Sequence, residues 1–292
     1  MTATDVREDS RQGRRPRGGG ATRDRLNAAL LGVLAAVVAL IIAIVITSIV
    51  LAVTDHNPYD TLKSMFDYGI KPDQLAATVN AGTTYYLSAI AVAVAFRMNL
   101  FNIGVDGQYQ LAAIVAAAFG GRYVLPEGLH QAAIILVAML VGSVWAGIVG
   151  VLKVTRGVSE VISSIMLNFI ATAIIGYLIL PAHFGVQRGN DLTTKPIGSS
   201  GQIGGIDLIP GSDTKVYGLV FLAVIVGVGF QLLISRTRFG FDLRATGRST
   251  SAAQASGVNV KRMIVVTMLI SGAIAGLVNM PVLLGEAHNY SL

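Results

Sequence analysis

The feature that most constrains this chain is a run of 28 residues, from Leu26 to Val53, without a charged side chain. About 20 consecutive apolar residues suffice to cross the hydrocarbon core of a bilayer as a helix. The run is too long for the apolar part of a signal peptide and lacks a small-residue cleavage site after it, so we expect a retained membrane anchor. Six further apolar stretches follow it: Leu75–Phe96, Ile103–Leu125, Leu129–Leu152, Val161–Ala182, Val216–Ser235 and Met263–Gly285.

Seven such stretches predict an all-α, polytopic membrane helix bundle. The composition agrees, because 53% of the residues are hydrophobic and only 13% are charged, which excludes a soluble globular protein and a disordered chain. Alternating strand patterns are absent, which argues against an outer-membrane barrel. The chain has no cysteine, and its four histidines lack ligand spacing, so we expect no metal site.

The basic residues predict the orientation, because lysine and arginine concentrate in cytoplasmic segments. With a cytoplasmic N-terminus and seven alternating spans, 16 of the 22 Lys and Arg residues fall inside. Residues 1–25 hold seven of these arginines and almost no large apolar side chain, so we expect a disordered basic tail. Residues 26–292 then form the transmembrane domain. The net charge of +6 reflects this asymmetry and not a surface for nucleic acid.

The longest cytoplasmic segment, residues 236–262, carries the local signals of a short helix. Ser249 or Thr250 is suited to cap it, Gly257 to end it in a left-handed conformation, and Asn259 to cap the next helix. An alanine-rich helix with small side chains suits docking into a groove on a partner. An ordinary basic loop that obeys the positive-inside rule is the alternative.

The residues of this segment resemble the cytoplasmic coupling loop of ABC importer permeases that move simple sugars, nucleosides and branched-chain amino acids. That family shows the pattern G-x-x-L-R-A-x-G-x-N-x-x-A-A-x-x-x-G-I. The pattern is matched at Gly240, Leu243, Arg244, Ala245, Gly247, Ala252, Ala253 and Gly257. The chain departs from it at Ser249 and Val258. Apart from Leu243, the matching residues are those that the resemblance implies in coupling to an ATPase.

Two further segments narrow the resemblance to the nucleoside-type permeases. FNIGVDGQYQLAA (Phe101–Ala113) resembles their N-I-G-x-E/D-G-Q element, and VSEVISSIMLNFIA (Val158–Ala171) resembles their E-x-I-x-x-I-M-L-N-x-I-A helix. Matching motifs run from about Tyr85 to Gly285. The resemblance implies a type II ABC importer permease fold. Family members usually continue with further helices beyond this point, which favours a truncated chain over one that ends after an odd number of spans.

The resemblance implies a permease subunit of an ATP-driven importer that carries nucleosides across the bacterial cytoplasmic membrane. No Walker A sequence is present, so the chain is expected to bind no cofactor and to use ATP through a partner. The implied partners are a cytoplasmic ABC ATPase, a second homologous permease, an extracytoplasmic solute-binding lipoprotein and membrane lipid, without nucleic acid. Import of simple sugars or another small polar solute is one alternative. An ion-coupled secondary transporter is another, although the helix interiors hold almost no carboxylate.

Polar side chains at membrane depth are costly and point to function by default. Glu160, Ser164 and Asn168 are spaced at i, i+4 and i+8 and therefore share one helix face. For Ser164 and Asn168, a translocation face and hydrogen bonding between helices are both open. We expect Glu160 to form an ion pair with a neighbouring cytoplasmic arginine.

The segment from Arg97 to Gln110 is the most polar piece near the membrane. Gly104 and Gly107 permit a broken helix, with Asn102 and Gln108 contacting nucleobase or ribose. A short cytoplasmic turn with Asp106 at a helix N-terminus is the alternative. The preceding helix adds the amide of Asn80 and the aromatic ring of Tyr85. These two groups either contact a base or lie at the membrane interface. The complete predicted pathway set is Asn80, Tyr85, Asn102, Asp106, Gln108, Ser164 and Asn168.

The last apolar stretch contains a G-x-x-x-G motif at Gly272 and Gly276. This motif permits close approach of two helices. We favour packing inside one subunit over dimerisation.

Overall fold

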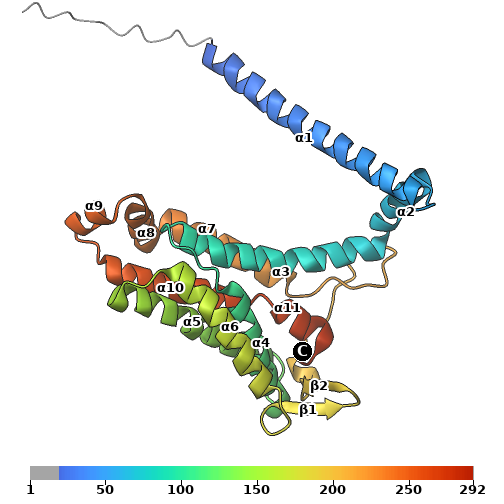
Figure 1. The fold of residues 1–292 in the computed structure, drawn as a ribbon. Helices are drawn as coiled ribbons and strands as arrows, with labels where there is room; N and C mark the ends of the chain where they lie inside the picture. Colours follow the sequence, from blue (N-terminus) through green and yellow to red (C-terminus); the bar gives the residue numbers. More distant parts are fainter. Residues whose placement is uncertain (1–19, 292) are drawn as a thin grey trace, which may run out of the picture. The chain divides into compact units, whose positions relative to one another are not determined.

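The computed structural model describes residues 20–291, in two compact units that meet in sequence between Gly69 and Ile70. The first unit contains helix α1 (Gly20–Val53) and helix α2 (Pro58–Gly69), drawn in blue in Figure 1. Most of the predicted basic tail lies outside the described residues. Its last residues, from Gly20, belong to α1, so this helix begins earlier than the apolar run.

The second unit is almost entirely helical. Its elements are α3 (Pro72–Phe96), α4 (Val105–Arg122), α5 (Leu129–Arg156), α6 (Glu160–Leu178), β1 (Gly185–Arg188), β2 (Asp191–Thr194), η1 (Ser199–Gly201), α7 (Val220–Arg236), α8 (Arg238–Arg248), α9 (Thr250–Ala255), α10 (Val260–Gly276), α11 (Met280–Val282) and the π-helical turn η2 (Leu283–Ala287). Each predicted apolar stretch contains a helix, which confirms the all-α prediction. The antiparallel hairpin β1–β2, which turns at Gly189 in the left-handed region, was not predicted.

Within the described residues, five helical segments are long and apolar enough to cross a membrane: α1, α3, α5, α6 and the stretch from α10 through η2. A sixth is counted if α7 and α8 form one span, although they meet at a bend of 72°. Helix α4 is not among them, because polar residues such as Asp106, Gln108 and Gln110 occupy its first turns. By length and composition, five or six helical segments of the described residues could therefore cross a membrane, compared with the seven that we predicted for the chain.

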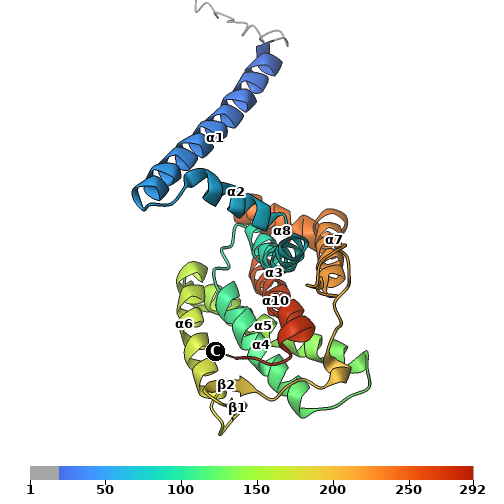
Figure 2. The ribbon, with the colours of Figure 1, turned by 90° about the vertical axis from the view of Figure 1, so that its right-hand side faces the viewer.

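Helix α10 is central to the second unit, where it packs against α5 and α3 (Figure 2). Glycines permit the close approach to α5. A side chain at Gly272 would overlap the backbone of Gly142 and the methyl group of Ala146, and one at Gly276 would overlap the backbone of Ala138. The G-x-x-x-G motif therefore packs within the chain, as we favoured.

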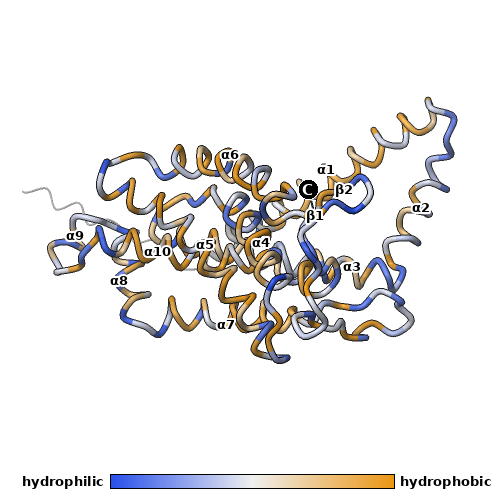
Figure 3. The backbone as a smooth tube through the Cα atoms, turned by 90° about the horizontal axis from the view of Figure 1, so that it is seen from below, coloured by the Kyte–Doolittle hydropathy of each residue, from blue (hydrophilic) through white to orange (hydrophobic). Residues whose placement is uncertain are grey.

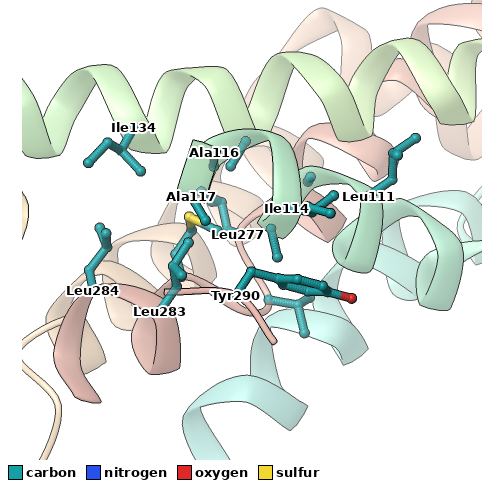
Figure 4. Packing of buried hydrophobic residues seen from close by; sticks show 14 of the residues in the cluster. Leu111, Ile114, Ala116, Ala117, Ile134, Leu277, Leu283, Leu284 and Tyr290 are labelled. Carbon is teal, nitrogen blue, oxygen red and sulfur yellow. The ribbon is translucent and has the colours of Figure 1, made fainter. Parts of the chain in front are cut away.

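Two apolar clusters stabilise the unit. The larger one joins α4, α5 and the segment from α10 to Tyr290; Figure 4 shows Ile114, Ile134 and Leu283 within it. The smaller one joins the end of α3 to α5, α8, α9 and α10, and includes Leu243 and Ala253. Because α8 and α9 contribute to this cluster, they belong to the folded body of the unit.

Candidate functional site

Helix α9 and its flanking turns form as the local sequence signals predict. The Ser249 hydroxyl accepts a hydrogen bond from the Ala252 N–H at 3.2 Å, which caps α9. Gly257 follows α9 with φ +86°, a conformation that favours glycine. Asn259 then caps α10 by accepting a 3.0 Å hydrogen bond from the Arg262 N–H. These predictions of local structure are confirmed.

Helix α8 was not predicted, although its own cap is visible in the sequence. The Thr237 hydroxyl accepts a 3.0 Å hydrogen bond from the Gly240 N–H and begins α8 directly after α7. Leu243 and Thr246 are buried, whereas Phe241 on the other side of the helix is exposed. The first half of the predicted loop is therefore a helix (Figure 1) with one packed side and one exposed side.

Several residues of the coupling-loop pattern fix α8 to other helices. A side chain at Gly240 would overlap the carbonyl groups at the end of α7, and Arg244 donates a hydrogen bond to the Ile234 carbonyl there. A side chain at Gly247 would overlap the Arg97 carbonyl at the end of α3. Ala245 is half-buried in the same helix. Helix α8 is therefore tied to the ends of both α7 and α3.

Helix α9 has one open side and one packed side. Ala252 is exposed, whereas Ala253 is 3% exposed and packs in the smaller apolar cluster. Gly257 is exposed after the helix. Figure 3 shows α8 and α9 as more hydrophilic than α5 and α10. The surface that α9 offers to a partner therefore includes Ala252 and excludes Ala253.

The predicted broken-helix segment contains a buried hydrogen-bonded joint. Asn102 and Gln108 are each 1% exposed, and their amides bond to each other in both directions at 2.9 and 3.1 Å. The Asn102 amide also donates to the Ser271 hydroxyl of α10 at 2.8 Å, and Ser271 donates to the Ala91 carbonyl of α3 at 2.6 Å. The Asn102 carbonyl oxygen accepts from the Gly104 N–H at 3.2 Å. We call these four polar groups, with Ala91, the Asn102 joint.

Asn168 makes a second connection to the start of α4. Its carbonyl oxygen accepts a 3.0 Å hydrogen bond from the Gly107 N–H, and its amide donates to the Ile103 carbonyl at 3.1 Å. Ser164 is fully buried and donates to the Val161 carbonyl of its own helix at 3.0 Å. Asn168 therefore bonds between segments, as in the hydrogen-bonding alternative, whereas the Ser164 bond lies within its own helix.

Glu160 forms the ion pair expected at the start of α6, but with a lysine instead of an arginine. Its carboxylate lies 2.5 Å from the Lys153 ammonium group in the last turn of α5. The intervening Gly157 adopts φ +68° and permits the tight turn between the two helices.

The other predicted pathway residues occupy different environments. Tyr85 is 75% exposed on α3, and exposed Asp106 accepts a 2.8 Å hydrogen bond from Gln110. Asn80 is buried and holds the segment before α7, donating to the Lys215 carbonyl at 2.9 Å and accepting from the Tyr217 N–H at 2.8 Å. The structure brings Asn102 and Gln108 together, and it does not bring Asn80 into the Asn102 joint.

A cavity of about 780 Å³, lined by polar and apolar groups, lies beside Asn80, between α3, the segment before α7 and η2. Thr84, Lys215, Tyr217 and Glu286 contribute to its lining. Tyr217 donates a hydrogen bond to Glu286, and burial together with this bond raises the pKa of the Tyr217 hydroxyl above its usual value. Sequence reasoning missed this cavity, because its walls are far apart along the chain.

The family model described as branched-chain amino acid transport system, permease component, matches residues 74–290, well over half of the chain. The chain belongs to this permease family. The match begins in α3 and ends after η2, so it contains the Asn102 joint and the α8–α9 segment. Helices α1 and α2 precede it.

Named relatives include permeases for nucleosides and for glucose. The guanosine ABC transporter permease protein NupP of Bacillus subtilis is 35% identical over 201 residues, which are 68% of this chain and 57% of the relative. The nucleoside ABC transporter permease protein NupB of Lactococcus lactis is 27% identical, covering 79% of this chain and 65% of the relative. The glucose ABC transporter permease protein TsgB13 of Haloferax volcanii is 29% identical, covering 65% of this chain and 52% of the relative.

This permease chain spans between half and two thirds of the length of those relatives. The predicted resemblance to nucleoside-type permeases is confirmed, since two of the relatives are nucleoside permeases by name. No solved structure matches the chain.

Proposed function

We propose that this chain is a membrane-spanning permease subunit of an ATP-driven ABC importer for nucleosides. The observation that carries the proposal is its 35% identity with a guanosine permease. The permease itself carries out no chemical reaction, and ATP is bound and hydrolysed by a separate cytoplasmic ATPase. The permease lies in the bacterial cytoplasmic membrane, where lipid surrounds it, and its N-terminus is cytoplasmic.

The ATPase docks on the open side of α9, around Ala252. A force on α9 reaches α8 through the cluster that contains Ala253, and α8 is attached to α7 at Gly240 and Arg244. The contact at Gly247 carries the same displacement to the end of α3. Closely packed groups move together, because an interior has little free volume to absorb a shift.

The Asn102 joint passes this displacement to the rest of the unit. It joins the start of α4 to α10 and α3 through hydrogen bonds that are all buried. Asn168 connects the start of α4 to α6. These residues, with Gln108 and Ser164, therefore position the helices, and the solute contacts other groups of the predicted pathway set.

The solute contacts in this proposal are Tyr85, Asp106 and the cavity beside Asn80. A nucleoside combines an aromatic base with ribose hydroxyl groups. An exposed tyrosine ring suits stacking on the base, and carboxylate and amide groups suit hydrogen bonding to the hydroxyls. The cavity of about 780 Å³ is within the usual size range of small-molecule sites.

Two further partners complete the importer. A second homologous permease faces this one across the pathway. A solute-binding lipoprotein delivers the solute at the end of the unit that carries the β1–β2 hairpin, opposite α8 and α9. Nucleic acid is not a partner, since the basic residues follow the membrane topology.

Uptake of radiolabelled guanosine tests this function in cells that carry the permease with its ATPase and binding protein. We expect uptake to stop when ATP is depleted and to continue under a protonophore. Uptake that stops under the protonophore while ATP is maintained would indicate an ion-coupled transporter. Glucose is the second solute to test, because of the relative in Haloferax volcanii. Glucose uptake without guanosine uptake would overturn the nucleoside assignment.

A further inference from the structure

Helix α2 lies between the first two predicted apolar stretches, in a segment for which no helix was predicted. Helix α1 ends at Val53, and α2 begins at Pro58 after the side chain of Asn57 accepts a 3.0 Å hydrogen bond from the Tyr59 N–H. Proline at the first position and an asparagine cap are both strong helix-start signals. Two residues after α2 ends, Pro72 begins α3. The helix thus joins one candidate membrane span directly to the next.

This connectivity constrains the direction of the α2 axis. Its 12 residues extend for about 18 Å at the usual rise of an α-helix. The two residues between α2 and α3 reach only about 7 Å even when fully extended. A helix standing upright on the membrane would therefore carry the start of α3 far from the bilayer. Because both ends of α2 connect to candidate spans, an axis along the membrane surface keeps both connections at the bilayer.

The side chains of α2 divide between an apolar and a charged side. Leu62, Met65 and Phe66 are spaced at i, i+3 and i+4 and share one side of the helix with Tyr59. Asp60, Lys63 and Asp67 lie together on the adjoining side of the helix. None of the α2 side chains is buried.

The apolar side of α2 must be covered by something other than water, because its large apolar side chains are exposed. Met65 and Phe66 are 65% and 67% exposed. The adjoining segment, Leu30–Val53, is long and apolar enough to cross a membrane and is not buried within its own unit, so we expect lipid around it. Tyrosine at the edge of such a surface is typical of the boundary between headgroups and acyl chains. The lipid surface around α1 therefore continues onto α2.

We propose that α2 is an interfacial helix, with Leu62, Met65 and Phe66 inserted at the headgroup boundary of the membrane and Asp60, Lys63 and Asp67 in water. The helix fixes the connection between the first two spans at the depth of the headgroups. The helix would lie at this depth whichever solute is transported and whichever face of the membrane is cytoplasmic.

Site-directed spin labelling tests the depth of each side of α2. The chain contains no cysteine, so one introduced cysteine gives one label. The full chain is reconstituted in lipid vesicles as Phe66→Cys, with the adjacent Asp67→Cys as the matched control. Val45→Cys, in the middle of the lipid-exposed α1 span, supplies the reference for acyl-chain contact. Collisions with oxygen report lipid, and collisions with a neutral water-soluble nickel chelate report water.

We expect the ratio of oxygen to nickel collisions to be severalfold higher at position 66 than at position 67, approaching the Val45→Cys reference. Equal ratios at positions 66 and 67 would overturn the proposal, since both sides would be in water. Low collision rates with both reagents at position 66 would also overturn it, because a protein surface would then cover this side. Met65→Cys replaces Phe66→Cys in the same comparison if the first variant does not reconstitute.

Discussion

The Asn102 joint and helix α9 belong to the same unit, but they are built in opposite ways. In the joint, Asn102, Gln108 and Ser271 direct their polar groups toward one another and toward backbone, and all three are buried. In α9, internal hydrogen bonds satisfy the helix ends, while Ala252 remains exposed. The joint is therefore suited to hold helices together, and α9 is suited to be recognised by another protein.

The largest effect should come from Asn102→Leu, which breaks the joint. The substitution leaves the Gln108 amide and the Gly104 N–H buried without partners, so we expect a loss of about 4 kcal/mol of stability. Thermal unfolding of the purified chain in detergent measures this loss. Gln110→Leu is the control, because Gln110 lies outside the joint and bonds to exposed Asp106. Equal destabilisation by the two variants would contradict a structural role for the joint.

The next effect separates the two sides of α9. Glutamate at Ala253 would place a charge in an apolar cluster, so Ala253→Glu should cost about 3 kcal/mol and lower the amount of folded protein. Ala252→Glu should leave folding unchanged and reduce ATP-driven uptake, since Ala252 is exposed. Membrane abundance and uptake are measured for both variants. Normal uptake with Ala252→Glu would exclude this side of α9 as the docking surface.

A smaller effect is expected for Asn168→Leu, which removes two hydrogen bonds between α6 and the start of α4. Stability should fall by about 2 kcal/mol, because the Gly107 N–H and the Ile103 carbonyl lose their partner. The ratio of guanosine to adenosine uptake, corrected for abundance, should not change. A changed ratio at normal abundance would mean that Asn168 contacts the solute.

The smallest effect is expected for Ser249→Ala, which removes the cap of α9. We expect a local loss of about 1 kcal/mol, confined to the first turn of the helix. Hydrogen exchange should become faster in α9 and stay unchanged in α10, whose cap is Asn259. Faster exchange throughout α10 would show that the two helices unfold as one.

The sequence alone was enough to predict the structure where the interactions that determine it are local. Ser249, Gly257 and Asn259 act on backbone groups within three residues or on their own dihedral angles, so their roles can be predicted from spacing. The apolar stretches also predicted the helices, because membrane helices need long apolar runs. Helix α8 was missed even though Thr237 and the apolar spacing after it indicated its start.

The sequence alone was not enough to predict contacts between segments that are far apart along the chain. Ser271 is 169 residues from Asn102, and no local pattern selects it as the partner. The opposite burial of Ala252 and Ala253 depends on how α9 packs against its neighbours, since a run of small residues has no apolar side of its own. The lysine partner of Glu160 depends on the turn at Gly157, which the apolar pattern does not reveal.

Photo-crosslinking from α9 tests the central claim most directly, namely that a separate ATPase docks on its open side. A photoreactive amino acid replaces Ala252 in cells that carry the whole importer, and Phe241, exposed on α8, serves as the comparison position. We predict a covalent adduct between the permease and the ATPase from position 252 that depends on irradiation. An ATPase adduct from position 241 but none from position 252, with both variants folded and active, would contradict the account.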